Sequence, residues 1–400
     1  MVSRPKSDLV KVLTFTTLYP NAARPQFGVF VENRLRHLVA SGEIAARVLA
    51  PVPFFPFKSE RFGPYGAFAR APRRERRFDI EIDHPRYFAL PKVGMDVAPF
   101  LLYVAARRAL GRLLRAGHSF DLIDAHYFYP DGVAAVMLGR TFGLPVTVTA
   151  RGSDINLIAE HAVPRSLIRR AARQADGVIA VSGALAAKLA DLGVERARVT
   201  VLRNGVDPEL FRPVETFGAE APRPLAVSVG NLVPLKGHDL VIAALAEVPD
   251  LTLWIVGGGP ERGRLEALAQ RLGVAPRVRF LGVVPHERMP GVYSVADVLV
   301  LASQREGWPN VLLEAMACGT RVVTTKVSDV ADLVNTPAAG AWVAERSAAS
   351  LAEAIRKVLG SPIPRDRTRE HALGFTWEET TRGQVRLFRE IVCHRGADGR

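Results

Sequence analysis

Two glutamates, Glu306 and Glu314, are the residues of this chain best suited to hold a ligand rich in hydroxyl groups. They stand eight positions apart in EGWPNVLLE, between an apolar strand expected at 297–302 and an apolar helix expected at 310–318. Open α/β sheets bind ligands where their strands end, so Glu306 lies on the binding loop and Glu314 about one turn into the helix. A carboxylate offers two acceptor oxygens to hydroxyls, which favours a sugar or another polyol. A solvated loop acid followed by a helix-surface acid gives the same spacing.

Two further positions after expected strands suit a phosphate. Lys236 and Gly237 open a helix, where the lysine charge adds to that of free backbone N–H groups. Gly28 begins the helix after the first strand, where a missing side chain lets a diphosphate approach the backbone. A solvated cap lysine and a plain turn glycine are the alternatives. The run at 257–260, GGGP, matches neither a Rossmann fingerprint nor a P-loop and is weak as a motif.

Polar residues also follow two expected strands of the first half. His126 lies just beyond a strand end in FDLIDAHYFYPDG, and Arg151 and Asp154 follow the next strand in TARGSDIN. The carboxyl ends of parallel strands share one edge of a sheet, so these side chains are expected to face a common cleft. A satisfied structural histidine is the alternative for His126.

Composition indicates an ordinary globular protein. The chain has 400 residues, of which 48% are hydrophobic and 23% charged, which predicts two domains with their own cores. Its two cysteines, Cys318 and Cys393, have no metal or redox spacing and fit a reducing compartment. The N-terminal apolar stretch is too short for a signal peptide or a membrane-spanning helix. We therefore expect a cytoplasmic protein.

The net charge of +13 is concentrated in the first half of the chain. Residues 1–200 hold 29 Lys and Arg against 17 Asp and Glu, whereas residues 201–400 hold 24 against 23. One cluster, Arg107, Arg108, Arg112 and Arg115, follows the apolar run at 97–106, which predicts an amphipathic helix with a basic end suited to an anionic bilayer surface. Arginines spread over solvated helix faces are the alternative. No nucleic-acid-binding motif accompanies them.

Short apolar runs alternate with helical patterns along both halves, which predicts βα units, parallel sheets and the α/β class. A stretch rich in Pro and acidic residues at 208–224 is the expected linker between two doubly wound domains. Helices are expected at 29–40, 131–142 and 183–191. Strands are expected at 10–16, 45–50, 121–124, 145–149, 177–181 and 199–202, and then at 225–229, 251–256, 278–281, 298–301 and 321–324.

Together these motifs resemble the retaining glycosyltransferases of family 4, which have the two-domain GT-B fold. The resemblance covers essentially the whole chain. Within the family, the chain is most similar to bacterial enzymes that build cell-surface polysaccharides on lipid carriers. It rests on RNGVD (203–207), VGNLVPLKG (229–237), IVGGGPER (255–262) and REGWPNVLLEAMACGTRVV (305–323), with YPNAARPQFGVF and DAHYFYPDG in the first half. It implies two Rossmann-like domains facing a central cleft: an acceptor-side domain at 1–205 with a returning C-terminal helix at 376–400, and a nucleotide-sugar-binding domain at 206–375.

The resemblance also implies roles for single residues. Glu306 would bind hydroxyls of the transferred sugar, Glu314 the ribose of the nucleotide, and Lys236 the diphosphate leaving group, while His126 would support the sugar in the transition state. His126, Lys236 and Glu306 form the implied catalytic set. The other implied donor contacts are Gly28, Asn231, Trp308, Asn310, Val311 and Leu312, and further phosphate or cleft contacts are Arg151, Asp154 and Arg203.

The chain departs from the family pattern at two places. Asn231 stands where an arginine is common, so half of the usual Arg/Lys diphosphate clamp is missing and Lys236, with Arg203 or Arg151, must carry more of it. The usual Gly-Pro-Glu segment is replaced by KVSDVADLV near Asp329, which removes that region as a guide to the base or the sugar.

The implied reaction is metal-independent transfer of a hexose from a nucleoside-diphosphate sugar to a lipid-linked or polysaccharide acceptor. The chain has no Asp-x-Asp pair, and no metal or cofactor is expected. No carboxylate nucleophile is identified, so retention is expected to follow front-side attack by the acceptor hydroxyl. The expected location is the inner face of the plasma membrane, in cell-envelope or exopolysaccharide synthesis. The alternatives are a sugar-nucleotide epimerase of the same fold and a non-catalytic binding protein; a dinucleotide dehydrogenase is disfavoured, because no glycine fingerprint follows either first strand.

Overall fold

The computed structural model describes residues 9–89, 94–214 and 221–398. The chain divides into two compact units, the first made of Met1–Arg203 and Glu378–Arg400 and the second of Asn204–Trp377. The sequence had placed these boundaries at 205/206 and 375/376. Part of the expected linker, 215–220, and the first eight residues of the N-terminal stretch lie outside the described residues.

The first unit is built on a sheet in the order β10-β9-β8-β7-β1-β2-β5-β4, in which only β4 is antiparallel to its neighbour. Strands β3 and β6, which flank β4 and β5 in the sequence, form a separate parallel pair. Its strands are β1 (Val10–Phe15), β2 (Ile44–Leu49), β3 (Val52–Pro53), β4 (Arg74–Arg77), β5 (Ile80–Asp83), β6 (Arg86–Tyr87), β7 (Leu122–His126), β8 (Val146–Ala150), β9 (Gly177–Ala180) and β10 (Val199–Val201). The central strands β7, β8 and β9 are buried throughout, as strands covered on both faces must be.

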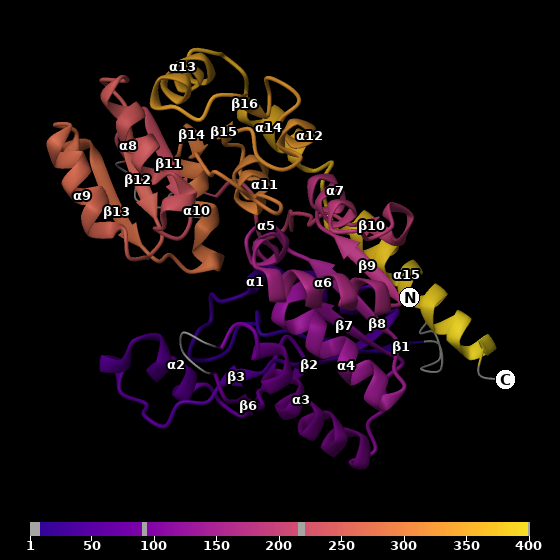
Figure 1. Cartoon of the computed structure of the whole chain (residues 1–400). Helices are drawn as coiled ribbons and strands as arrows, with labels where there is room; N and C mark the ends of the chain where they lie inside the picture. The colour runs from indigo at the N-terminus through magenta and orange to yellow at the C-terminus, as the bar shows by residue number, and fades with distance from the viewer. Residues whose placement is uncertain (1–8, 90–93, 215–220, 399–400) are drawn as a thin grey trace. The chain divides into compact units, whose positions relative to one another are not determined.

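Helices connect these strands, and the last helix of the chain returns to the first unit (Figure 1). Val385 and Phe388 of this helix, α15 (Trp377–Asp398), are buried with Val10, Val12 and Leu122 of the sheet. The other helices of this unit are α1 (Val29–Ala40), α2 (Pro64–Arg70), α3 (Ala98–Arg115), α4 (Val133–Phe142), α5 (Ser153–Asn156), α6 (Ala162–Gln174) and α7 (Gly183–Asp191).

The second unit has an all-parallel sheet in the order β13-β12-β11-β14-β15-β16. Its strands are β11 (Leu225–Val229), β12 (Thr252–Val256), β13 (Val278–Gly282), β14 (Val298–Leu301), β15 (Arg321–Thr325) and β16 (Gly340–Val343). Its helices are α8 (His238–Ala246), α9 (Arg262–Arg271), α10 (Met289–Val295), α11 (Asn310–Ala317), α12 (Val330–Leu333), α13 (Ala348–Leu359) and α14 (Arg365–Ala372). One core joins buried residues of α8, α9 and α13 to those of β11, β12 and β14.

The expected α/β class with parallel sheets is confirmed, and each sheet reverses its strand order at one point. In the first unit the reversal lies between β1 and β7, and in the second between β11 and β14. Loops that leave the carboxyl ends of such a strand pair diverge and open a crevice for a ligand. The sequence had not predicted β3, β4, β5, β6 or β16. Within the described part of the chain, no helix combines the length and the apolar character needed to cross a membrane.

Candidate functional site

Lys236 and Glu306 meet at the point where the second sheet reverses. Lys236 follows β11 and Glu306 follows β14, and the two strands are direct parallel neighbours, with Ala226 opposite Val298. The Nζ atom of Lys236 lies 2.6 Å from Oε1 of Glu306, and both side chains are mostly buried. The structure thus brings together the two residues that the sequence proposed for the diphosphate and the sugar.

Ser303 and Arg346 belong to the same cluster, although the sequence analysis did not select them. The Ser303 hydroxyl donates to Oε1 of Glu306 over 2.7 Å, so this oxygen has two protein donors. Nε of Arg346 donates to the carbonyl oxygen of Ala302 over 2.9 Å. Ser303 immediately follows the strand run and Arg346 precedes α13, so only the position of Ser303 after a strand carried a sequence signal.

Gly237 allows the lysine loop to lie against the end of β14. Its φ of 68° is left-handed, and it caps the N-terminus of α8 after the short turn Pro234–Lys236. A Cβ atom here would lie 2.2 Å from the carbonyl oxygen of Ala302. The close approach therefore requires glycine, and it holds Lys236 beside Glu306.

The first turn of α11 provides backbone donors close in sequence to Glu306. Asn310 and Val311 are half-buried, whereas the side chains of Trp308 and Leu312 are buried in the core. The N–H groups of Asn310 and Leu312 already donate to the carbonyl oxygens of Trp308 and Pro309, each over 3.0 Å. Because their side chains are buried, Trp308 and Leu312 could contact a ligand only through backbone atoms.

Asn310 is tied to the segment that follows the first unit, because Nδ2 of Asn204 donates to its Oδ1 over 3.2 Å. Asn231, the departure from the family pattern, lies exposed after β11.

Glu314 has a separate set of partners. The hydroxyl of Tyr293 on α10 donates to Oε2 over 2.8 Å, and Nε2 of His286 lies 3.5 Å from Oε1. Burial raises the pKa of Tyr293 well above its ordinary value, and the neighbouring Glu314 adds to that shift, so the hydroxyl stays protonated and remains a donor. Phe211 contacts the rings of both His286 and Tyr293. The carboxylate is thus held in a fixed position by groups that the sequence had not singled out.

In the first unit, His126 lies at the reversal point of the sheet but is completely buried. Nη2 of Arg151 lies 2.6 Å from its Nδ1, and Oδ2 of Asp124 lies 3.2 Å from its Nε2. Burial lowers the pKa of His126 to about 4, although Asp124 acts in the opposite direction. The imidazole is therefore neutral at pH 7, with Nδ1 accepting from the guanidinium and Nε2–H facing the carboxylate. The sequence expected this ring to face a sugar; here both nitrogens face protein groups.

Asp124 links His126 to the returning helix. It accepts from the hydroxyl of Thr147 over 2.8 Å and from Nε2 of Gln384 on α15 over 3.0 Å. Gln384 in turn accepts from Nε of the fully buried Arg34 over 2.6 Å. Burial opposes ionisation of Asp124, but His126, Thr147 and Arg34 outweigh it and hold its pKa below the ordinary value.

Asp154 and Gly28 hold backbone in place. The carboxylate of Asp154 accepts the N–H groups of Phe128 and Gly152, each over 2.8 Å, and that of Arg151. Gly28 has a φ of 78°, and a Cβ atom there would lie 2.4 Å from the carbonyl of Leu18. The groups that approach Asp154 and Gly28 in the structure thus belong to the chain itself, and the ligand contacts expected of these two residues stay a prediction.

A third buried carboxylate, Asp131, lies at the same edge and was missed by the sequence analysis. It accepts from the N–H of Thr17 over 2.6 Å and from the hydroxyl of Thr16 over 3.1 Å. Burial raises its pKa to about 7, against the effect of these hydrogen bonds. Arg203 ends the first unit, where its carbonyl accepts from the hydroxyl of Thr380 on α15.

Comparisons with known proteins cover both units. The model of "Glycosyl transferases group 1" matches residues 215–374, and that of "Glycosyltransferase Family 4" matches residues 68–210. The D-inositol 3-phosphate glycosyltransferase of Acidothermus cellulolyticus is 32% identical over an alignment 339 residues long, which covers 76% of this chain and 75% of that protein.

Among solved structures, sucrose-phosphate synthase from Thermosynechococcus elongatus is similar with a TM-score of 0.81 and 22% identity, covering 96% of this chain and all of that one. HepE of Anabaena, solved in complex with UDP, gives a TM-score of 0.71 and 20% identity, covering 96% of this chain and all of that one. At these identities the two structures establish the GT-B fold alone.

Proposed function

The chain belongs to glycosyltransferase family 4 and is a glycosyltransferase, and on that basis we propose that it transfers a hexose from a nucleoside-diphosphate sugar to a hydroxyl of a lipid-linked or polysaccharide acceptor, with retention of configuration. The observation that carries the proposal is the Lys236–Glu306 pair, 2.6 Å apart at the reversal point of the second sheet. A cation beside a carboxylate that can accept from hydroxyls would suit a sugar diphosphate, and this supports the proposal.

Lys236 would stabilise the leaving diphosphate. An ammonium group has three N–H donors, so Nζ can keep its bond to Glu306 and still donate to phosphate oxygens. Negative charge grows on the diphosphate as the glycosidic bond breaks, and a fixed cation placed there lowers the barrier. Backbone N–H groups at the start of α11 would add to this effect. No metal ion is needed in this scheme.

Glu306 and Glu314 would hold the two ends of the donor. Lys236 and Ser303 both donate to Oε1 of Glu306, which leaves Oε2 as the oxygen that a sugar hydroxyl can reach. Glu314, fixed by Tyr293, would accept from the ribose hydroxyls. For the chemical step we propose front-side attack, in which the acceptor oxygen bonds to the anomeric carbon on the face that the diphosphate leaves, and the hydroxyl proton passes to the departing diphosphate oxygen.

The first unit would bind the acceptor and support the sugar. We propose that neutral His126, held between Asp124 and Arg151, fixes the guanidinium of Arg151 at the edge of the sheet, where it meets an anionic group of either substrate. His126 would therefore act by holding Arg151 in position, because its own imidazole is buried.

A second acceptor class is favoured by a specific observation. The relative from Acidothermus cellulolyticus, 32% identical over three quarters of each chain, is named a D-inositol 3-phosphate glycosyltransferase. A phosphorylated cyclitol would present the anion that Arg151 is suited to bind. The two candidates share the donor site and differ only in the acceptor.

The test begins with the donor. Thermal unfolding is measured with a panel of UDP, GDP, ADP and dTDP sugars, in magnesium and in EDTA. A ligand at 100 times its dissociation constant raises stability by about 2.7 kcal/mol. The proposal expects one nucleotide to stabilise the protein equally with and without magnesium; a shift that needs magnesium contradicts metal independence, and no shift with any donor contradicts the proposal.

The acceptor is then tested with the donor that binds. Release of the nucleoside diphosphate is measured with a polyprenyl-diphosphate sugar, a capsular oligosaccharide and inositol 3-phosphate as alternative acceptors. Stimulation by either of the first two, with an α-linked product from an α-linked donor, supports the proposed function. Stimulation by inositol 3-phosphate alone assigns the second class.

We also propose that the enzyme works in the cytoplasm at the inner face of the plasma membrane, as part of cell-envelope or exopolysaccharide synthesis. A lipid-linked acceptor is found there, and the excess of positive charge in residues 1–200 suits that anionic surface. Fractionation of cells at low and high salt tests the location, because a peripheral protein leaves the membrane fraction at high salt.

A further inference from the structure

The first unit carries exposed apolar side chains that sugar transfer does not require. They come from the segment after β3, from the segment after β6 and from the start of α3. Phe88 is 67% exposed and Phe57 is 56% exposed. Soluble proteins rarely gather so many large apolar groups on one part of their surface. We call this set the aromatic face: Phe54, Phe57, Tyr65, Phe88, Met95, Val97, Phe100 and Val104.

Ring contacts hold the aromatic face in shape. The half-buried Phe55 contacts Phe57, Phe62 and Tyr65, with ring centroids 5.4 to 5.9 Å apart. Phe54 and Phe88 directly follow the paired strands β3 and β6, and their centroids are 5.5 Å apart. The rings thus contact one another, and Phe57 and Tyr65 also contact the half-buried Phe55, while each of them stays exposed.

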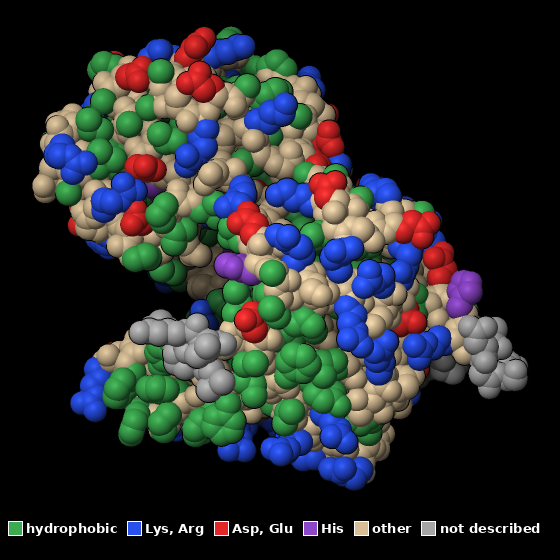
Figure 2. Space-filling model, in the orientation of Figure 1, with side chains coloured by type: hydrophobic (Ala, Val, Ile, Leu, Met, Phe, Trp, Pro, Cys, Tyr) green, Lys and Arg blue, Asp and Glu red, His purple; other side chains and the backbone are tan. Residues whose placement is uncertain are grey.

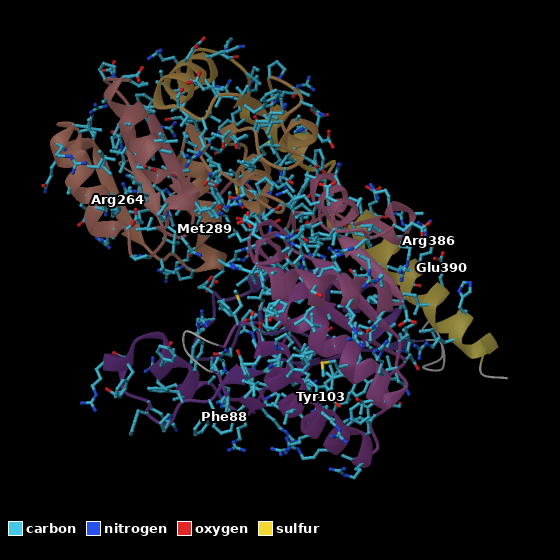
Figure 3. All side chains as sticks on the ribbon, viewed as in Figure 1. Phe88, Tyr103, Arg264, Met289, Arg386 and Glu390 are labelled. Carbon is cyan, nitrogen blue, oxygen red and sulfur yellow. The ribbon has the colours of Figure 1, made fainter. Side chains whose placement is uncertain are left out.

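Cationic side chains border the aromatic face. The exposed side of α3 begins with Phe100 and Val104 and continues with exposed arginines in its later turns: Arg107, Arg108, Arg112 and Arg115. Lys58, Arg61 and Arg70 are exposed around α2. Figure 2 shows hydrophobic side chains over the region of α2, β3, β6 and α3, with Lys and Arg along its lower edge. Phe88 and Tyr103 are labelled in this region in Figure 3.

We propose that the aromatic face and its basic border bind a lipid bilayer with anionic headgroups, and that Phe57, Tyr65 and Phe88 enter the headgroup region. Aromatic rings favour the membrane–water interface, and arginines at its edge pair with anionic lipids. The inference rests on the proposed function only in that a lipid-linked acceptor requires such docking. It goes beyond the expectation from sequence, which rested on the apolar run at 97–106 with the arginines that follow it and on the basic first half, and did not include Phe54, Phe57, Tyr65 or Phe88.

The charge of the surrounding residues favours binding to a bilayer over association with a second copy of the chain. Residues 54–115 hold 13 Lys and Arg against 6 Asp and Glu. Two copies joined through this face would bring two basic borders together, and like charges in contact oppose association. An anionic bilayer can bury the apolar rings and pair its headgroups with the cations at the same time.

The experiment measures binding of the full chain to phosphatidylcholine vesicles with and without phosphatidylglycerol. The unaltered protein is expected to bind the anionic vesicles more tightly. Phe57→Ser with Phe88→Ser should lower the affinity about tenfold, because two rings no longer enter the interface. Replacing the α3 arginines, Arg107, Arg108, Arg112 and Arg115, by Ser should lower it at least about a hundredfold and remove the preference for anionic lipid.

A control variant replaces one exposed apolar residue and two exposed arginines on another helix of the unit. Val163→Ser with Arg169→Ser and Arg170→Ser on α6, all exposed, should leave vesicle binding nearly unchanged. An equal loss in this variant would mean that diffuse charge, not the aromatic face, binds the membrane.

Three further results would overturn the inference. These are no binding of the unaltered protein to anionic vesicles, unchanged binding of the Phe57→Ser/Phe88→Ser variant, and a dimer in sedimentation that this variant dissociates. Thermal stabilisation by the donor is measured on every variant. Retained donor binding with lost vesicle binding separates this inference from the proposed function, because the donor site lies in the other unit.

Discussion

Replacing Lys236 by Ala should remove most of the catalysis and leave the fold intact. A unit charge about 4 Å from a phosphate charge contributes about 4 kcal/mol at an effective dielectric constant of about 20. The Lys236 side chain is 24% exposed and shares its charge with Glu306, so part of this is lost to screening. A loss of about 3 kcal/mol of transition-state stabilisation, or roughly a hundredfold in kcat, is expected.

The same replacement should cost little stability. A partly exposed ion pair contributes about 0–1 kcal/mol, and Glu306 keeps the hydrogen bond from Ser303. The melting temperature should therefore fall by no more than about 4 °C.

Two assays separate a diphosphate contact from a general effect. Release of the nucleoside diphosphate from the donor sugar measures turnover, and calorimetry compares the affinities for the nucleoside diphosphate and monophosphate. Lys236→Ala should weaken the diphosphate by at least about tenfold and the monophosphate much less. Lys357→Ala, an exposed lysine on α13 of the same unit, is the matched control and should change neither. Normal turnover in Lys236→Ala, or equal losses for both nucleotides, would refute the role assigned to this cation.

Four further outcomes are expected. Glu306→Gln should lower kcat at least about a hundredfold with little change in nucleotide affinity, measured by steady-state kinetics and calorimetry; a loss confined to nucleotide affinity contradicts a sugar contact. Glu314→Ala should abolish the preference, about tenfold in the unaltered protein, for a ribonucleotide over its 2′,3′-dideoxy analogue, and a retained preference places the ribose elsewhere. Asp124→Ala should lower the free energy of unfolding by about 3–5 kcal/mol in urea titrations, because buried donors lose their acceptor, whereas Asp121→Ala, at a half-buried position just before β7, should cost about 1 kcal/mol. Burial, aided by the charge of Lys236, lowers the pKa of His238 to about 4, so the unfolded chain binds a proton at this histidine before the folded chain does, and stability falls as the pH drops from 6.5 towards 4. His238→Gln should reduce that fall by about 3 kcal/mol, measured by urea titrations across this pH range. An unchanged dependence of stability on pH contradicts this expectation.

The positions of several helices and strands were predictable from local sequence. The strand expected at 225–229 agrees with β11 residue for residue, the strand expected near 298–301 agrees with β14, and α1 and α7 of the first unit begin and end as predicted. Continuous apolar runs that end before a glycine or a polar loop report burial on both faces without reference to the rest of the chain. Family 4 membership and the GT-B fold, expected from the motifs, are confirmed by the family models and by the fold of known structures.

The first-unit strands that were missed lack such a pattern. β4 reads RERR and pairs antiparallel with β5 through residues of alternating exposure. Its arginines are satisfied by partners that folding provides: Arg74 binds Asp83 and Arg77 binds Glu32, so a charged segment becomes an edge strand. No local signal predicts a strand whose charges are paired only in the folded state.

The sequence by itself determined the elements with continuous apolar runs, the strand ends that carry Lys236, Glu306 and His126, and the family, because each depends on residues close together in the chain. The tertiary structure decided what surrounds those residues. His126 is buried against Asp124, whose partner Gln384 lies 260 positions further along, and Glu314 is held by a tyrosine of another helix. Such contacts depend on how helices and strands pack over long separations, and packing decides whether a polar side chain faces a ligand or is bonded within the core.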